Sequence, residues 1–267
     1  GNDPRDAEEG DKVIVELAPR AEGKLSGRIV QVLGSGRDPA VDVPMIIVEF
    51  ALPTEFPEKV LAEAEALGEG VSPADLKGRE DLRGETIVTV DPESAQDFDD
   101  AISLKRAAEG WRLGVHIADV SHYVRPGTAL WEEAAERATS VYLPGRTIPM
   151  LPERISNSLC SLRPDEDRLT LSVFMDLDDD GNLKDFRIAR SVIRSARRLT
   201  YAQALTAMLG ETTELPALVV GLLKGAGQLA ALRTKFRRRR GALEIDRPEV
   251  ELEYEGDRVS GAHPQAR

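Results

Sequence analysis

The sequence predicts an α+β fold, in which a small partial β-barrel precedes a larger domain of mixed strands and helices. Short β-branched segments separated by Gly, Pro and Asp fill the first fifty residues, as in small barrels. Farther along, strand-like and helix-like segments follow one another without the regular alternation of a doubly wound sheet. A length of 267 residues is enough for more than one domain with a buried core.

The barrel segments come first along the chain. Strands are predicted at residues 12–17, 25–33 and 45–50, because each is short, apolar and bounded by turn-forming residues. Apolar residues at helical spacing then predict a helix over 53–68, which ends at a glycine. A polar connector, residues 69–84, separates it from the second domain.

The second domain contains both kinds of element. Strands are predicted at 85–91, 101–105, 111–118, 169–177 and 183–194, with a turn at Asp180-Gly181 before the last one. Helices are predicted at 128–138, 200–209 and 216–240. The last helix ends in four arginines before Gly241, which fits the preference of helix C-termini for basic residues and glycine.

Composition limits the class of protein. No apolar run approaches the roughly 20 residues of a membrane span, so we expect no membrane association. The charged start, residues 1–12, lacks the apolar stretch of a secretory signal. Cys160 is the one cysteine, so an internal disulfide is excluded and we expect a buried structural thiol in a cytoplasmic protein.

Charge is unevenly distributed along the chain. The net charge is −12, which at first argues against a nucleic-acid partner. Residues 187–240, however, hold twelve Lys or Arg against two Glu, a net charge of +10 that leaves −22 for the remainder. An acidic part beside a basic part suits an enzyme that binds cations in one place and a polyanion in another. Two unrelated solvated surfaces are the alternative.

Four aspartates occur within ten residues, directly after a predicted strand: Asp91, Asp97, Asp99 and Asp100. Like charges this close repel one another unless cations neutralise them. Carboxylates without His or Cys suit Mg²⁺, and two such ions can promote phosphodiester hydrolysis. From the residues alone, a solvated acidic loop remains an equal alternative.

Other motifs carry less weight. Asp176–Gly181 resembles the start of an EF-hand loop, but Arg187 stands where its final Glu is needed, so a hairpin turn is expected. His116 and His122 lack cysteine partners, and no zinc site is predicted. No Walker A or Gly-x-Gly-x-x-Gly motif occurs, so no nucleotide cofactor is expected. Arg237–Arg240 could be a solvated helix end or a phosphate-binding surface.

Longer motifs resemble one family closely. They are TVDPESAQDFDDAISL at 89–104, LGVHIADVSHYVRPG at 113–127, the stretch 139–173 that begins TSVYLPG, and RRRRGALEID at 237–246. In this order they resemble the RNB catalytic domain of the ribonuclease II and ribonuclease R family, on the ribonuclease R side. The upstream motifs resemble the end of a cold-shock domain, which is an OB-type barrel. The resemblance therefore implies three parts: 1–52 cold-shock, 53–84 linker and 85–267 catalytic.

The resemblance also implies an activity and roles. Family members bind Mg²⁺ at these four acidic positions and degrade single-stranded RNA from its 3′ end, processively and hydrolytically, to nucleoside 5′-monophosphates. By matching positions, Asp91 and Asp100 are expected to be direct ligands, Asp99 the most critical for chemistry and Asp97 supporting. Tyr142 matches the aromatic that packs on a terminal base, although a lone tyrosine otherwise usually packs in a core. The resemblance favours phosphate contact by four arginines, Arg237, Arg238, Arg239 and Arg240. We also expect the protein to be a monomer.

Two further expectations concern completeness and alternatives. The family's catalytic domain continues beyond the position of residue 267 into an arginine-rich segment, so this chain alone is expected to be inactive. An RNA-binding protein without catalysis is the main alternative, and Mg²⁺-dependent release of mononucleotides would distinguish the two. A phosphatase with an aspartyl nucleophile at Asp97-Phe98-Asp99 has less support, because a polar turn instead of a buried strand precedes it.

Overall fold

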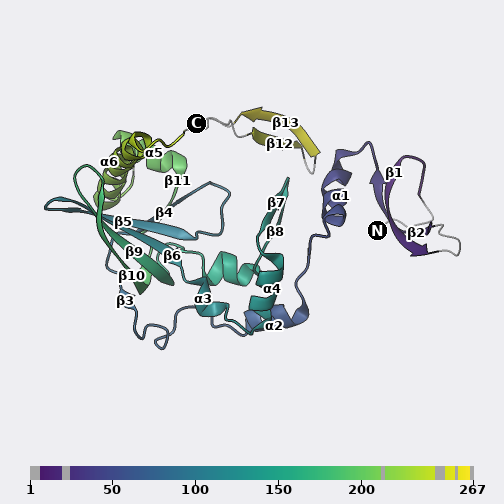
Figure 1. Ribbon diagram of the computed structural model, residues 1–267, viewed down its shortest axis with the longest axis horizontal. Coiled ribbons are helices and arrows are strands. Elements are labelled where there is room, and N and C mark those ends of the chain that lie inside the picture. The colour runs from purple at the N-terminus through teal and green to yellow at the C-terminus, as the bar shows by residue number, and fades with distance from the viewer. Residues whose placement is uncertain (1–6, 20–24, 212–213, 244–249, 256–257, 265–267) are drawn as a thin grey trace. The chain divides into compact units, whose positions relative to one another are not determined.

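The computed structural model describes residues 7–19, 25–211, 214–243, 250–255 and 258–264 (Figure 1). The chain forms two compact units, which we describe separately. One contains residues 1–56, 137–150 and 245–267, and the other contains 57–136 and 151–244. Each unit is therefore assembled from segments that are distant in sequence.

A seven-stranded mixed sheet forms the centre of the second unit. Its strands, in spatial order, are β11 (Arg197–Thr200), β4 (Val88–Asp91), β5 (Asp100–Ala107), β6 (Gly110–Ala118), β9 (Asp167–Leu177), β10 (Leu183–Arg194) and β3 (Glu80–Asp81). The two edge strands pair in parallel with their neighbours, and the other pairs are antiparallel. The predicted turn at Asp180-Gly181 joins β9 to β10, and Gly181 adopts the left-handed φ of 78° that favours glycine.

Two helices, α5 (Tyr201–Leu209) and α6 (Ala217–Arg239), pack against one side of this sheet (Figure 1). Thr200 and Gln203 form a capping box at the start of α5, which satisfies its first backbone donors. Between helices and strands lies a core of Val88, Leu199, Ala204, Ala207, Val219, Leu222 and Leu223. Gly225 permits close approach, because a Cβ there would lie 3.0 Å from the Trp111 ring and 2.9 Å from Leu104.

Shorter helices precede and follow β6 in sequence. They are α2 (Glu58–Glu65), α3 (Val120–Tyr123), α4 (Ala129–Arg137) and the π-helical turn η4 (Arg154–Leu159). Glu63 on α2 accepts a hydrogen bond from the backbone N–H of Leu130 on α4 at 2.9 Å. Arg154 donates to the carbonyls of Ala64 and Leu67, so the C-terminal end of α2 is bonded both to α4 and to η4.

The described residues of the first unit form three antiparallel strand pairs and short helices. They are β1 (Asp11–Pro19) with β2 (Leu25–Ser35), β7 (Val141–Leu143) with β8 (Arg146–Ile148), β12 (Val250–Glu255) with β13 (Arg258–Pro264), η3 (Pro39–Val41) and α1 (Asp42–Glu49). Arg137 links its segments by donating to the carbonyls of Pro53, Glu55 and Pro149.

Most predicted elements of the second domain are confirmed within a few residues, but one strand prediction is wrong. Residues 45–50 lie mainly in helix α1, whose first turn contains Asp42 and Pro44, two residues that helix starts favour. Helix α2 begins only at Glu58, because Pro53 and Pro57 interrupt the predicted 53–68 helix. Among the described helices, none is long and apolar enough to cross a membrane.

Candidate functional site

The four aspartates lie at one end of the sheet, where two neighbouring strands meet a connecting loop. Asp91 is the last residue of β4 and Asp100 is the first residue of β5. Asp97 and Asp99 lie in the loop between them. Because β4 and β5 are antiparallel neighbours, the chain leaves and re-enters the sheet at the same end. We call residues 91–100 the acidic loop.

Arg198 on β11 anchors the start of the acidic loop. Its Nη2 donates to the carbonyls of Pro92 at 2.6 Å and Glu93 at 2.8 Å. Its guanidinium also lies over the Phe98 ring, 5.4 Å from the centroid. One arginine therefore holds the first residues of the loop and contacts a side chain near its end.

The end of the loop is held by backbone and by one serine. Ser161 Oγ donates to the Gln96 carbonyl at 2.8 Å and accepts from the Phe98 N–H at 3.2 Å. The N–H of Leu162 donates to the Phe98 carbonyl, and the N–H of Ala118 donates to the Asp99 carbonyl. These bonds fix the backbone and leave the aspartate side chains for other partners.

Repulsion and burial shift the pKa of two aspartates upward. Burial is the larger cause for Asp91, with the charges of Asp100 and Asp97 adding to it, and all three raise its pKa. Partial burial comes first for Asp99 too, followed by the charges of Asp97, Asp100 and Asp91, although its side chain remains open to solvent on one side. The carboxylates therefore interact with one another, and the protein does not fully compensate their charge.

The donor set fits a hard cation. Among the residues that the structure describes, the buried Asp91 Oδ2 has no hydrogen-bond partner, and neither has the buried Thr89 hydroxyl. The proximity of Thr89 nevertheless lowers the pKa of Asp91. Within the described part of the chain, no three Asp, Glu, His or Cys side chains already form a complete ligand set. Mg²⁺ typically takes only one or two carboxylates and completes its shell with water and substrate phosphate. An open acidic site with an unpaired carboxylate oxygen is compatible with this coordination preference of Mg²⁺.

The other predicted site residues lie on exposed surfaces. Tyr142 on β7 is 71% exposed, so it is not a core aromatic, and it belongs to the first unit. Arg237, Arg238 and Arg239 form the exposed last turn of α6, and Arg240 follows at its C-cap. Within the second unit, the structure thus brings the four aspartates together in one loop and places the arginines at the end of α6.

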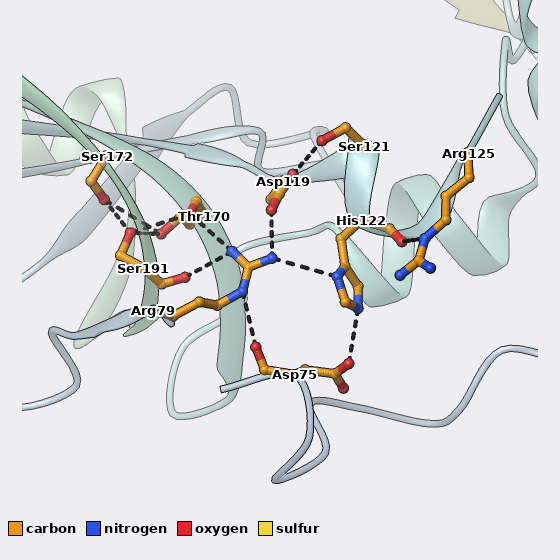
Figure 2. Close-up of polar contacts among 9 residues, drawn as sticks. All are labelled: Asp75, Arg79, Asp119, Ser121, His122, Arg125, Thr170, Ser172 and Ser191. Atoms are coloured by element: carbon orange, nitrogen blue, oxygen red, sulfur yellow. Dashed lines mark hydrogen bonds and ion pairs between the residues drawn. The ribbon is translucent and has the colours of Figure 1, made fainter. Parts of the chain in front are cut away.

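A second polar region, centred on Arg79 and Asp119, lies beside the acidic loop, to which the Ala118 N–H is bonded. Figure 2 shows the bonds that pair Arg79 and Asp119 with their neighbours. Arg79 Nη2 donates to Asp119 at 2.6 Å, and their side chains are only 5% and 2% exposed. Asp119 follows β6, and its Oδ1 accepts from the Ser121 hydroxyl. Burial alone would raise the pKa of Asp119, but the bonds from Ser121 and Arg79 lower it below its ordinary value.

The histidines and the cysteine serve structure. His116 is 1% exposed and bonds Ser103 and Ser172, and burial lowers its pKa to about 4. His122 faces Asp75 at 3.0 Å and Arg79 at 3.5 Å. Cys160 is buried, and burial raises the pKa of its thiol to about 12, as expected for a structural thiol.

Two supporting residues were missed by the sequence interpretation. Arg198 and Ser161 reach the acidic loop from positions 105 and 63 residues away along the chain. Neither stands in a motif whose local spacing indicates a contact with the aspartates. Only the pairing of β11 with β4 and the return of residues 161–162 to the loop bring them there.

Comparison with protein families identifies both parts of the chain. The RNB domain matches residues 79–267, and the cold-shock domain matches residues 1–57. Ribonuclease R of Thermotoga maritima is 44% identical over 258 residues, which are 92% of this chain and 36% of that protein. Ribonuclease R of Aquifex aeolicus is 41% identical over 250 residues, 91% of this chain and 35% of that protein. The chain thus spans about a third of the length of these relatives.

Structural comparison agrees. Mycoplasma genitalium RNase R, solved in complex with ribose-methylated single-stranded RNA, superposes with a TM-score of 0.90 at 28% identity. The match covers 99% of this chain and 42% of that one. An RNB match over more than half of the chain, with the acidic loop inside it, decides the assignment: the chain belongs to the RNB-domain family, and ribonuclease R proteins are among its relatives.

Proposed function

We propose that this chain provides the metal-binding part of a processive 3′-to-5′ exoribonuclease that hydrolyses RNA to nucleoside 5′-monophosphates. The observation that carries the proposal is the acidic loop, whose backbone is anchored on both sides while its carboxylates remain uncompensated. The ribonuclease R relatives and the RNA bound to the Mycoplasma protein support RNA as the substrate.

The cofactor in this proposal is Mg²⁺, held by Asp91 and Asp100 with Asp97 and Asp99 around it. When bound, it supplies a Lewis acid and an activated water for phosphodiester hydrolysis. The protein's own part is to hold the carboxylates in place and to keep their charge available. Arg198 and Ser161 hold the backbone that carries the carboxylates. The Asp91 Oδ2 atom, which no described residue bonds, leaves negative charge available for the cation.

RNA contacts outside the acidic loop complete the proposal. The exposed ring of Tyr142 stacks on a base near the 3′ end, and Arg237–Arg240 bind backbone phosphates. The division into cold-shock part (1–52), linker (53–84) and catalytic part (85–267) belongs to the same proposal, as do a cytoplasmic location and a monomeric state.

The test follows a 5′-labelled RNA incubated with the full-length natural protein, in Mg²⁺ and in EDTA, on a denaturing gel. We expect shortening from the 3′ end only in Mg²⁺, with release of 5′-monophosphates. Asp99→Asn should abolish hydrolysis and keep most RNA binding, because phosphate and base contacts elsewhere provide affinity. Glu93→Gln is the matched control, since Glu93 is an exposed acid in the same loop with no proposed role.

Three outcomes decide against the proposal. Wild-type rates in Asp99→Asn would remove the acidic loop from the chemistry. Internal cleavage products would mean that the enzyme is not an exonuclease. RNA binding by the wild-type protein without cleavage in Mg²⁺ would instead identify an RNA-binding protein without catalysis.

Tyr142 has its own test, in which Tyr142→Phe is the control that keeps the stacking ring. Tyr142→Ala should change the length of the final product more than the overall RNA affinity, because stacking on one base contributes only about 1–3 kcal/mol. An unchanged product length in Tyr142→Ala would show that this ring does not set where digestion stops.

A further inference from the structure

A polar pocket of about 300 Å³ lies beside the Arg79–Asp119 pair. Its lining consists of Arg79, Asp119, Ser121, His122, Arg125 and Arg190. Every one of these side chains is polar, and three carry a guanidinium. In a chain with a net charge of −12, such a concentration of positive charge needs a reason.

Arg79 lines the pocket, and each nitrogen of its guanidinium is already engaged with an acceptor. Its Nε donates to the Asp75 carbonyl, its Nη1 faces the carbonyls of Thr170 and Ser191, and its Nη2 binds Asp119 (Figure 2). Because Asp119 neutralises Arg79 and both side chains are almost fully buried, the pair supports the pocket structurally and does not itself bind a ligand.

Arg125 and Arg190 differ from Arg79 in both exposure and pairing. Arg125 is exposed and uses Nε to bind the His122 carbonyl at 2.9 Å, which orients the guanidinium. Among the described residues, neither the terminal nitrogens of Arg125 nor the side chain of Arg190 has a hydrogen-bond or ion-pair partner. Arg190 acts on Asp119 only through its charge, which lowers the pKa of that carboxyl. With Arg79 compensated, the pocket therefore keeps two uncompensated positive charges.

Strand register relates this pocket to the acidic loop. Asp100 pairs with Ile117, Ile117 with Leu171, and Leu171 with Arg190, so the four residues form one row across β5, β6, β9 and β10. Side chains directly opposite one another on antiparallel strands point to the same face. Three strand spacings of about 4.8 Å place the two ends of the row about 14 Å apart.

The middle of this row is open to solvent. Ile117 is 43% exposed and Leu171 is 37% exposed. The same face of the sheet therefore presents an aspartate of the acidic loop, then an accessible apolar strip, then an exposed arginine. A few nucleotides of single strand can span this distance, with bases over the apolar strip and phosphates toward the two polar ends.

We propose that Arg125 and Arg190 bind a phosphate group, and that its source is a backbone phosphodiester of the RNA strand, a few nucleotides from the one at the acidic loop. Guanidinium groups suit this ligand because their paired donors match phosphate oxygens. The inference rests on the proposed function for the identity of the polyanion. The same phosphate chemistry is present in a released mononucleotide or in free phosphate, and the experiment separates these sources.

The test measures binding of a single-stranded oligoribonucleotide in EDTA, where no hydrolysis occurs, at several salt concentrations. The full-length natural protein is compared with Arg125→Gln, Arg190→Gln and the double variant. Lys184→Gln is the control, because it removes one exposed positive charge from the same strand, where Lys184 already pairs with Asp178. Inorganic phosphate and a nucleoside 5′-monophosphate are titrated in parallel.

Each pocket variant should weaken RNA binding about three- to tenfold at 0.1 M salt, equally for different base sequences. The slope of log K against log salt should fall by about 0.7, the value of one single-strand phosphate contact. The double variant should lose no more slope than that, because both arginines hold one phosphate. Lys184→Gln should keep the wild-type slope.

Three results overturn the inference. They are an unchanged slope in both pocket variants, an equal loss in Lys184→Gln, or a loss of mononucleotide or phosphate binding without any loss of RNA binding. Arg125→Lys and Arg190→Lys, which keep the charge, should retain most affinity and guard against misfolding. Binding is measured in EDTA, separately from cleavage. If the wild-type protein hydrolyses RNA but the pocket variants keep the wild-type salt slope, only this inference is refuted. If the pocket variants lose slope but the wild-type protein does not hydrolyse RNA, only the proposed exoribonuclease activity is refuted.

Discussion

The Arg79–Asp119 pair and the acidic loop lie at the same end of one sheet, joined through the backbone bond from Ala118 to Asp99. The two regions differ in how their carboxylates are paired and in the direction of their pKa shifts. Asp119 is almost fully buried, is bonded through both oxygens, and has a lowered pKa. Asp91 has a raised pKa and a buried oxygen that finds no partner in the described part of the chain.

Under the proposed function, this contrast separates a structural use of charge from a functional one. A buried charge is tolerated when partners satisfy it, as Arg79 and Ser121 satisfy Asp119. Carboxylates that repel one another remain in a fold when something outside the protein is to neutralise them, and such perturbed groups concentrate at functional sites. The same backbone region thus contains a paired framework and an unpaired site.

The largest effect is expected on the framework. Asp119→Asn should lower the free energy of unfolding by about 3–5 kcal/mol, because it leaves the buried Arg79 charge uncompensated. Urea denaturation at pH 7 measures this. Asp176→Asn is the control, since the Asp176–Arg112 pair is exposed and solvent screening leaves it a much smaller contribution. Equal losses in the two variants would mean that burial does not distinguish the pairs.

A smaller effect concerns His116, which belongs to the same buried framework. Its pKa in the folded state is about 4, against an ordinary 6.5. Below pH 6.5 the unfolded state takes up a proton that the folded state does not, so stability falls as the pH drops from 6.5 toward 4. The loss should total about 3 kcal/mol.

The measurement is the free energy of unfolding at pH 6.5, 5.5 and 4.5 for the wild type and His116→Gln. The variant should be less stable at pH 6.5, because Ser103 and Ser172 lose their partner, but its dependence on pH should be flatter. Parallel pH profiles would show that His116 does not titrate as its burial implies.

Arg198 connects framework and site, and its replacement should act on metal binding. Arg198→Ala frees the start of the acidic loop and should raise the Mg²⁺ concentration for half-maximal activity about tenfold, a common effect of residues behind metal ligands. Arg198→Lys should recover part of the affinity. Arg197→Ala is the neighbouring control, because the Arg197 side chain donates to the Ala196 carbonyl and, among the described residues, to no other group. If both alanine variants bind Mg²⁺ alike, Arg198 does not position the loop.

The sequence could predict features that depend on residues close together along the chain. The strands around 101–105, 111–118, 169–177 and 183–194 follow from local alternation and turn residues, and the acidic loop is visible as a run of aspartates. Segment 45–50 was predicted wrongly, because a short apolar run fits a strand or a buried helix equally well.

The supports of the site could not be predicted in the same way. Arg198 and Ser161 reach the acidic loop through strand pairing and chain return across many residues, and no local pattern records such contacts. The register that aligns Asp100 with Arg190 likewise depends on three successive strand pairings. The chemistry of the site was therefore visible in the sequence, whereas its geometry required the fold.

The contrast between paired and unpaired carboxylates is tested most directly by the thermal stability of Asp91→Asn with and without Mg²⁺. The pKa of Asp91 is raised, so its ionisation costs stability once the pH rises above that pKa, and no cost remains below about pH 4. In EDTA at pH 7 we predict that Asp91→Asn is more stable than the wild type, a gain that disappears below about pH 4. Millimolar Mg²⁺ should stabilise the wild type and have little effect on the variant. A variant that is less stable than the wild type in EDTA, and is stabilised equally by Mg²⁺, would contradict the account.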